Sequence, residues 1–285
     1  MEFTYPKKEL ADHRMSMKKL VIVKPGCKEF GNELLNHISI YAYGLDIEAE
    51  VVNHSVYGYP SPLRAVHALY ARFISYKHRE CSLSAWRAPI FLPPTKPLSR
   101  VGACNNTLYF FGWVFRNQLG LTRHRENILK AFAPTGLLLE KIDHILSPWK
   151  GRRLVGVHLR QESFKGFPKS EFLVPVTRVR KIVDEYLKEK GLHAKDVTLI
   201  IVSDADIPKE TFADFAVHLS LGNTPTNLFL LSRCSVVLGT NTTFSNVAAW
   251  FGNVPHIVTT NEAIDWTYYR AQHMYFENKY ATFAF

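Results

Sequence analysis

The sequence predicts an α/β protein with parallel sheets, and three observations lead to this fold class. Several short runs, of which 197–202 is the clearest, consist mostly of apolar and β-branched residues and are expected to be buried strands. Between them lie helical patterns, such as 176–187, in which apolar residues recur every three or four positions. Glycines such as Gly191 and Gly252 follow the helical patterns, as is typical of helix ends. Buried strands that alternate with helices indicate a parallel sheet covered on both faces.

In the first half, this alternation is clear only at the start. We expect a strand over 19–24, a loop over 25–30, a helix over 31–44 and a second strand over 47–53. From residue 57 to residue 149, aromatic and proline-rich stretches alternate, and no order of elements is predicted there.

The second half carries the full pattern. We expect strands over 154–159, 197–202, 216–219, 235–239 and 254–258, and helices over 176–187, 227–233 and 242–250. The predicted domains are therefore 19–149 and 150–267, with a boundary near 148–151. Residues 1–18 are interpreted as an extension or a tag, and the aromatic tail 268–285 is expected to pack back on the first domain.

Composition and charge narrow the classes of function. The chain has 285 residues, of which 47% are hydrophobic and 21% charged, which argues against a disordered or coiled-coil protein. A net charge of +10 favours an anionic partner such as nucleic acid, anionic lipid or a phosphorylated substrate. The basic residues are scattered and aromatic residues do not interleave with them, so a nucleic-acid-binding protein is the weaker alternative.

Three further features of the sequence bear on the cellular compartment of the protein. No apolar run approaches the roughly 18 residues that span a bilayer, so no transmembrane segment is expected. Residues 1–19 are polar and lack the apolar core of a signal peptide. The four cysteines are widely spaced, which fits a reducing compartment better than a metal site. We therefore expect a cytoplasmic protein, with no glycan on the sequon at Asn241.

Three loops between a predicted strand and a helix are suited to phosphate. The first, 26–36, leads into a helix N-terminus, and the third, 239–245, adds hydroxyl groups to such a start. The second ends a buried strand with His158 and Arg160, and the planar fork of an arginine matches phosphate oxygens. Taken singly, the first loop also fits a tight turn, the second a salt-bridged arginine and the third a threonine N-cap. Together they indicate a nucleotide in a cleft between two domains, without a Walker or dinucleotide-binding motif.

Three segments also resemble, in this order, the motifs of the GT-B fucosyltransferase superfamily, which includes α-1,2-, α-1,6- and protein O-fucosyltransferases. They are FGNELLNHISIYAYG at 30–44, VGVHLR at 155–160 and NLFLLSRCSVVLGTNTTFSNVAAWFG at 227–252. The resemblance implies a GT-B-like fold of two Rossmann-like parallel-sheet domains with the nucleotide-sugar site in the cleft between them. It further implies an inverting glycosyltransferase that needs no metal, with a nucleotide-sugar as co-substrate and a glycan as acceptor.

The resemblance also assigns roles to matching residues. The first domain becomes the acceptor side, and the second binds the nucleotide-sugar. Arg160 matches the arginine that grips the donor pyrophosphate and stabilises the departing nucleotide. The expected donor-binding residues are Asn32, His158, Asp204, Asn227, Thr242, Thr243, Phe244 and Ser245. Inversion calls for a base that takes the acceptor proton, and Glu29, Glu33 and His37 are candidates of equal standing.

Two departures from the family pattern bear on the donor. The acid that often follows the arginine is displaced or absent here, where Gln161, Glu162 and Ser163 stand. Asn227 replaces an aspartate that typically reads the guanine edge. Because an amide offers one acceptor and one donor, a pair that suits uracil, we expect a UDP-sugar such as UDP-xylose. GDP-fucose is the alternative donor, and a non-catalytic sugar-binding module is a further alternative.

Overall fold

The computed structural model describes residues 19–24, 30–53, 99–104, 107–112, 115–162, 173–222 and 224–271. The chain divides into two compact units, 1–135 and 136–285, each with its own sheet. This division falls one helix earlier than the boundary expected near 148–151. The reason is that α6 (Gly136–Leu146) packs against α8 (Pro225–Ser232) of the second unit.

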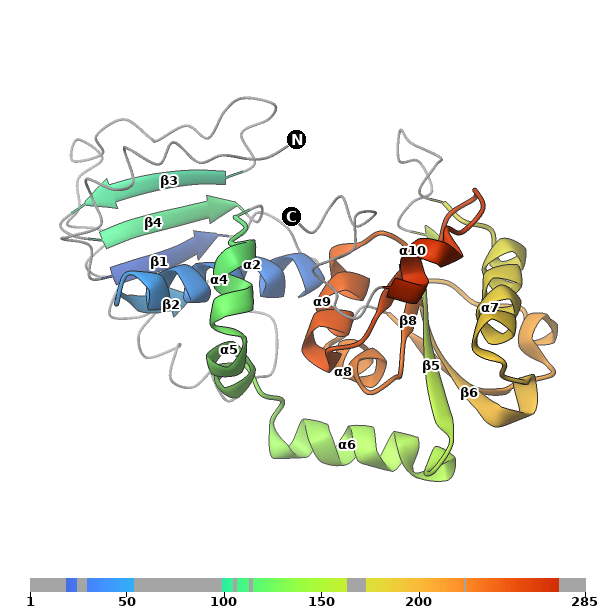
Figure 1. Ribbon diagram of the computed structural model, residues 1–285. Helices are drawn as coiled ribbons and strands as arrows, with labels where there is room; N and C mark the ends of the chain where they lie inside the picture. Colours follow the sequence, from blue (N-terminus) through green and yellow to red (C-terminus); the bar gives the residue numbers. More distant parts are fainter. Residues whose placement is uncertain are drawn as a thin grey trace. The chain divides into compact units, whose positions relative to one another are not determined.

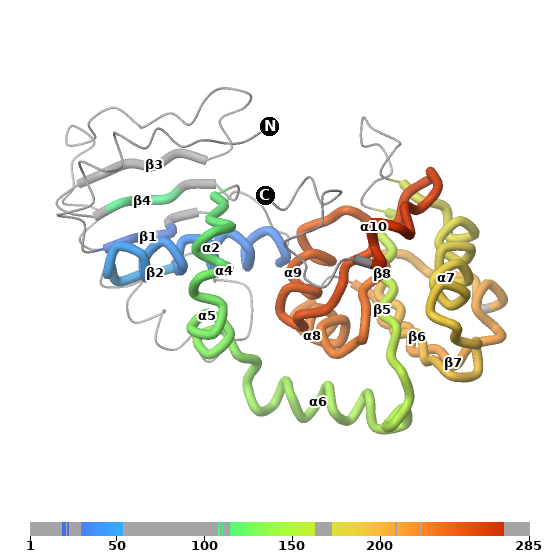
Figure 2. The backbone as a smooth tube through the Cα atoms, in the orientation of Figure 1, coloured from blue at the N-terminus to red at the C-terminus, as the bar shows by residue number. Residues whose placement is uncertain are grey.

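The second unit is built on five parallel strands in the order β7-β6-β5-β8-β9. Figure 2 traces β7 along the edge beside β6. The strands are β5 (Arg153–Leu159), β6 (Val197–Ser203), β7 (Ala216–Leu221), β8 (Val237–Gly239) and β9 (His256–Val258). The chain runs outward from β5 to β7 and then returns to β8, so the strand order reverses between β5 and β8. Open α/β sheets bind ligands at such a reversal, beyond the carboxyl ends of the strands.

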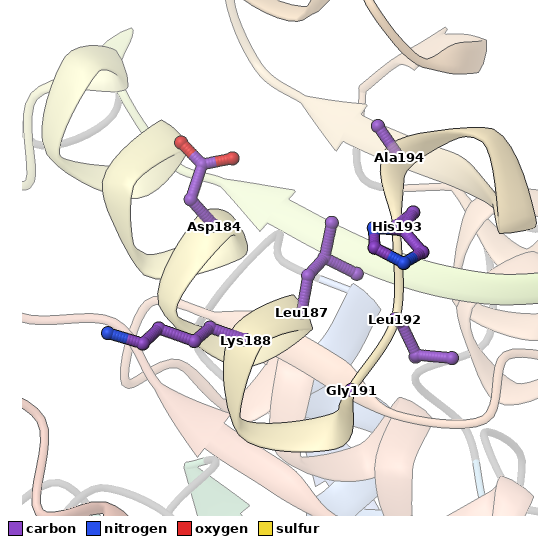
Figure 3. Close-up of a pocket in the computed structure, with 7 residues that line it drawn as sticks. All are labelled: Asp184, Leu187, Lys188, Gly191, Leu192, His193 and Ala194. Carbon is purple, nitrogen blue, oxygen red and sulfur yellow. The ribbon is translucent and has the colours of Figure 1, made fainter.

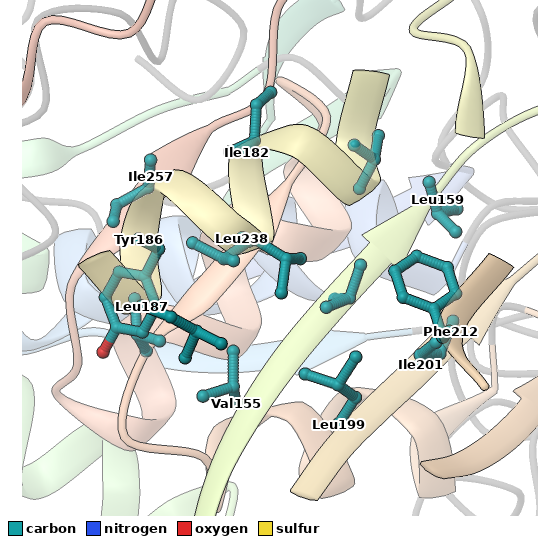
Figure 4. Close-up of a cluster of buried hydrophobic side chains, with 14 of the residues drawn as sticks. Val155, Leu159, Ile182, Tyr186, Leu187, Leu199, Ile201, Phe212, Leu238 and Ile257 are labelled. Atoms are coloured by element: carbon teal, nitrogen blue, oxygen red, sulfur yellow. The ribbon is translucent and has the colours of Figure 1, made fainter. Parts of the chain in front are cut away.

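Helices cover both faces of this sheet (Figure 1). On one face, α7 (Val176–Lys190) packs on the odd-numbered residues of β5, as Figure 4 shows for the buried cluster around Val155 and Leu159. On the other lie α8 and α9 (Thr243–Gly252), and a Cβ added to Gly156 would meet Leu231 of α8 at 3.0 Å. The alternation of side chains along a strand thus separates an apolar face from the face that carries His158.

The ends of two helices depend on the left-handed backbone region. Gly191 caps α7 with a φ of 62°, as the sequence predicts. At α9 the left-handed cap is Asn253, with a φ of 52°, and not the predicted Gly252. Gly252 is the last helical residue, and a side chain there would lie 2.3 Å from the carbonyl oxygen of Ser232. Its role is therefore to let α9 approach the end of α8.

The first unit has a four-stranded sheet in the order β2-β1-β4-β3. Its strands are β1 (Lys19–Lys24), β2 (Glu50–Asn53), β3 (Ser99–Cys104) and β4 (Thr107–Gly112). β1 is parallel to β2 and β4, whereas β3 is antiparallel to β4, so this sheet is mixed and not purely parallel as expected. Its helices are α2 (Phe30–Asp46), α4 (Gln118–Arg123) and α5 (Arg125–Ala131).

Every helix and strand expected in the second half is present, with ends that differ by a few residues. Of the aromatic tail, the structure describes 268–271, which belong to α10 (Trp266–Ala271). Tyr268 and Tyr269 pack on the core of the second unit, and the hydroxyl of Tyr269 accepts a hydrogen bond from the N–H of Val258. Residues 1–18 and 272–285 lie outside the described residues. Among the helices described, none is long and apolar enough to cross a membrane.

Candidate functional site

A strand and a helix of the second unit are joined by a hydrogen bond where the strand order reverses. His158 of β5 is fully buried, and its Nδ1 lies 2.6 Å from Oγ of Ser245 in the first turn of α9. Gly239 of β8 is paired with His158 in the sheet. A Cβ on Gly239 would lie 2.6 Å from that Oγ and 3.3 Å from Cβ of His158. The close approach of α9 to β5 therefore requires glycine at this position.

The loop between β8 and α9 is held by its own polar groups. Oγ1 of Thr242, the N-cap, accepts a hydrogen bond from the N–H of Ser245 at 3.3 Å. The N–H of Thr242 donates to the carbonyl of Thr240 at 2.7 Å. The ring centroid of Phe244 lies 5.0 Å from that of His158. Thr243, the residue before Phe244, is buried. Because N–H groups at a helix start lack partners in the helix, this end of α9 is suited to an anion.

Arg160 follows β5 directly and is half-buried. The turn behind it is fixed by Asp204, at the end of β6, whose Oδ1 accepts hydrogen bonds from the N–H groups of Gln161 (2.6 Å) and Glu162 (3.1 Å). Oδ1 of Asp204 is therefore occupied by the backbone of this turn. Its geometry supports an orienting role for Asp204.

Asn227, in the first turn of α8, has both amide hydrogens engaged within its own unit. Its Nδ2 donates to the carbonyls of Leu221 (3.0 Å) and Gly222 (2.6 Å), and its Oδ1 accepts from Oγ of Ser220 (2.6 Å). The side chain is 2% exposed and holds the connection between β7 and α8 together. The amide donor on which the expectation of uracil depended is therefore already used.

Of the residues expected in the first unit, Asn32, Glu33 and His37 lie in the first two turns of α2. Asn32 is buried and Glu33 is half-buried. Nδ1 of His37 accepts a hydrogen bond from Nδ2 of Asn53 at 2.9 Å, and its ring packs edge-to-face on Phe132 at 4.7 Å. The third candidate base, Glu29, lies outside the described residues.

The structure thus brings His158, Thr242, Phe244 and Ser245 together and places Asp204 behind the turn of Arg160. Asn227 lies apart from them, at the connection that follows the edge strand β7. Asn53, whose side chain holds the ring of His37, is not among the site residues expected from the sequence. Its signal was a polar residue at the carboxyl end of a predicted strand, where ligand-binding residues gather.

An open hollow of about 480 Å³ lies at the carboxyl end of α7, lined by Leu187, Leu192 and His193 among others (Figure 3). It precedes β6, so it lies at the amino ends of the strands, away from His158. Among the described residues, no group of three or more His, Cys, Asp or Glu is arranged to hold a metal ion.

Solved structures provide the comparison that decides the fold. The chain is similar to NodZ α-1,6-fucosyltransferase soaked with GDP-fucose, with a TM-score of 0.54 at 15% identity over 86% of this chain and 97% of that one. The fold is that of the GT-B fucosyltransferases. A second GT-B neighbour, POFUT1 in complex with GDP, has a TM-score of 0.52 at 12% identity, over 86% of this chain and 98% of that one.

A third GT-B structure, fucosyltransferase NodZ from Bradyrhizobium, gives a TM-score of 0.50 at 14% identity over 85% and 95% of the two chains. No family model matches the sequence, and neither does any curated protein. The GT-B fold implied by the three sequence motifs is therefore confirmed. At these identities the likeness establishes the fold alone.

Proposed function

We propose that the protein is an inverting fucosyltransferase that transfers fucose from GDP-fucose to a hydroxyl group of a glycan. The observation that carries the proposal is the hydrogen bond between His158 and Ser245, which joins the end of β5 to the start of α9. It holds Arg160 on a strand end that is tied to a helix N-terminus. An arginine and a helix N-terminus at one sheet edge suit a diphosphate.

The chemistry follows from where charge develops. As the bond between C1 of the sugar and the phosphate oxygen breaks, negative charge grows on the diphosphate. The guanidinium of Arg160 stabilises this charge with directed hydrogen bonds, aided by the N–H groups at the start of α9. The acceptor oxygen attacks C1 from the opposite side, which inverts the configuration.

GDP-fucose replaces UDP-xylose as the proposed donor. The preference for uracil assumed that Asn227 offers both a donor and an acceptor, but both amide hydrogens are donated to backbone carbonyls. Three neighbouring structures were soaked with GDP-fucose, co-crystallised with GDP or solved in complex with GDP. Neither the structure nor the comparisons support a UDP-sugar.

Calorimetry with GDP and UDP on one preparation tests the proposal. We expect GDP to bind at least about tenfold more tightly, a difference of about 1.4 kcal/mol. Transfer from GDP-fucose to a panel of glycans should then persist in EDTA. Arg160→Ala should lose on the order of 10²–10³ in rate, and Arg160→Lys should recover little of it, because a point charge lacks the fork. Tighter binding of UDP, or normal turnover by Arg160→Ala, would contradict the proposal.

A further inference from the structure

Asn246 is a fully buried amide near the start of α9. It is 0% exposed, and its backbone N–H donates to the carbonyl of Thr242, the N-cap, at 3.1 Å. Neither Nδ2 nor Oδ1 of its side chain has a hydrogen-bond partner in the part of the chain that the structure describes. The residues that follow it, Val247, Ala248 and Ala249, are apolar and buried. Asn246 is therefore a polar side chain in a place that would accept an apolar one.

An amide without partners in such a place works against the stability of the fold. A buried polar group that makes no hydrogen bond keeps the full cost of its lost contact with water. A leucine has a similar branched shape and would carry no such cost. Because nearly all buried polar groups in folded proteins have partners, an exception calls for a reason other than the fold. Binding sites commonly contain groups of this kind, since their partners arrive with the ligand.

The position of Asn246 on the helix directs its amide toward the N-terminus of α9. Side chains of an α-helix tilt toward its N-terminal end, and residues three and four positions apart share a face. Asn246 therefore shares a face with Thr242 and Thr243, in the turn that begins the helix. Oγ1 of Thr242 lies 3.5 Å from Nδ1 of His158. The amide thus belongs to the sheet edge at which the diphosphate is proposed to bind, and it lies wholly within the second unit.

The chemistry of the amide selects the kind of group that it can bind. A primary amide has two N–H donors and one acceptor oxygen. A phosphate oxygen only accepts, so it would leave Oδ1 of Asn246 without a donor and next to negative charge. A hydroxyl group both donates and accepts, so it satisfies both ends of the amide. Both amide atoms are shielded from solvent, so a hydroxyl group reaches them after a rotation of the side chain, a change that is common on binding.

We propose that the amide of Asn246 binds a hydroxyl group of the nucleotide-sugar, on its fucose or on its ribose. This assignment rests on the proposed function. Both sugars flank the diphosphate, so their hydroxyl groups lie within a few bonds of the phosphates that the start of α9 is proposed to hold. A site built to pair with a hydroxyl group rejects an analogue that lacks it, because the amide is then left unpaired. Asn246 is therefore a residue that determines donor specificity.

The test compares Asn246→Leu and Asn246→Ala with Thr259→Val. Thr259 is the matched control because it is 3% exposed and its Oγ1 has no partner among the described residues. Ile257, two residues earlier, packs in the core beneath α7, so the alternation of side chains places Thr259 on the face away from α9. Both Asn246 variants should raise the Kd for GDP-fucose by about tenfold or more, and Thr259→Val should leave it within about twofold.

Stability should move in the opposite direction. Asn246→Leu removes the unpaired amide, so the thermal midpoint of the ligand-free protein should rise by about 2–4 °C. A residue that served only the fold would not gain stability and lose affinity in the same variant. GDP and GDP-fucose distinguish the two hydroxyl sources. If the Kd rises for GDP-fucose alone, the hydroxyl group is on fucose, and if it rises equally for both ligands, the hydroxyl group is on the ribose.

The outcomes separate two failures. GDP binding to the wild type is measured first, and its absence would overturn both the proposed function and the assignment of Asn246. If the wild type binds GDP, then a Kd for GDP-fucose within about twofold of the wild type in both Asn246 variants would overturn the assignment alone. Weaker binding together with a lower thermal midpoint in both variants would also overturn it, because the amide would then serve the fold.

Discussion

Oδ1 of Asp204, at the end of β6, accepts a hydrogen bond of 2.6 Å from the backbone N–H of Gln161, just beyond the end of β5. The same oxygen accepts a second hydrogen bond from the N–H of Glu162. Arg160 is the residue immediately before this pair of N–H groups. The backbone that carries the proposed phosphate ligand is thus fixed by a side chain from the neighbouring strand.

Asp204→Ala should lower fucosyl transfer by about 10²-fold, because small displacements of a charged ligand cost that much. Asp204→Asn keeps an acceptor oxygen in the same place and should retain most of the rate. Transfer rates are measured alongside circular dichroism, to confirm that each variant folds. If Asn is as damaging as Ala in a folded protein, then the charge of Asp204 acts on the donor itself.

Gly239→Ala should destabilise the second unit by about 1–3 kcal/mol, as expected for overpacking. The added methyl group would lie 2.6 Å from Oγ of Ser245, which must move away from His158. Unfolding in urea measures the loss, and GDP affinity should fall with it. Gly136→Ala is the control, since a methyl group there meets nothing within 4 Å. Equal stability of the two variants would show that α9 does not sit this close to β8.

Asn227→Asp should destabilise the protein by about 1–3 kcal/mol and should not improve GDP binding. The carbonyls of Leu221 and Gly222 would lose their donors and face a carboxylate instead. Thermal unfolding with and without GDP measures both effects. Asn261→Asp, at an exposed residue with a single hydrogen bond to a carbonyl, is the control and should change little. A stable Asn227→Asp with tighter GDP binding would show that this side chain reads the base.

Glu33→Gln should become more stable than the wild type as pH rises. Burial raises the pKa of Glu33 from 4.5 when unfolded to about 7 when folded, so between these values the native state holds more protons than the unfolded state. The wild type therefore loses stability from pH 4.5 to about pH 7, whereas neutral Gln does not. At pH 8, the wild type should have lost on the order of 1 kcal/mol of stability that Glu33→Gln keeps. The loss is this small because solvent screens the exposed half of the side chain. Identical pH profiles of the two proteins would mean that the pKa is not raised.

The second half of the fold could be predicted because its elements follow from local patterns. The run 197–202 is buried along its whole length, and Gly191 takes the left-handed cap that its place after α7 suggests. β3 and β4 could not be predicted. The stretch 57–149 from which they come offers no regular pattern, and β3 pairs antiparallel, a relation that no local periodicity encodes.

The candidate site was predictable as a set of residue types and not as a set of contacts. The pattern around His158 and Ser245 placed both residues at strand and helix ends, which the structure confirms. The interactions of Asn227 with Ser220 and Gly222 depend on the shape of one connection, which residue types do not determine. For the same reason, the sequence could not show that Asn53 holds Nδ1 of His37, because this contact forms between distant parts of the chain.

The hydrogen bond between His158 and Ser245 joins residues 87 positions apart. Closing so long a loop costs chain entropy before the contact contributes any stability. β6, β7 and α8 all lie within that loop. Contacts of such sequence separation are typical of slowly folding topologies. The proposed phosphate-binding edge is therefore expected to mature late in folding, and a chain that ends before α9 would have the strand of His158 without the partner that completes it.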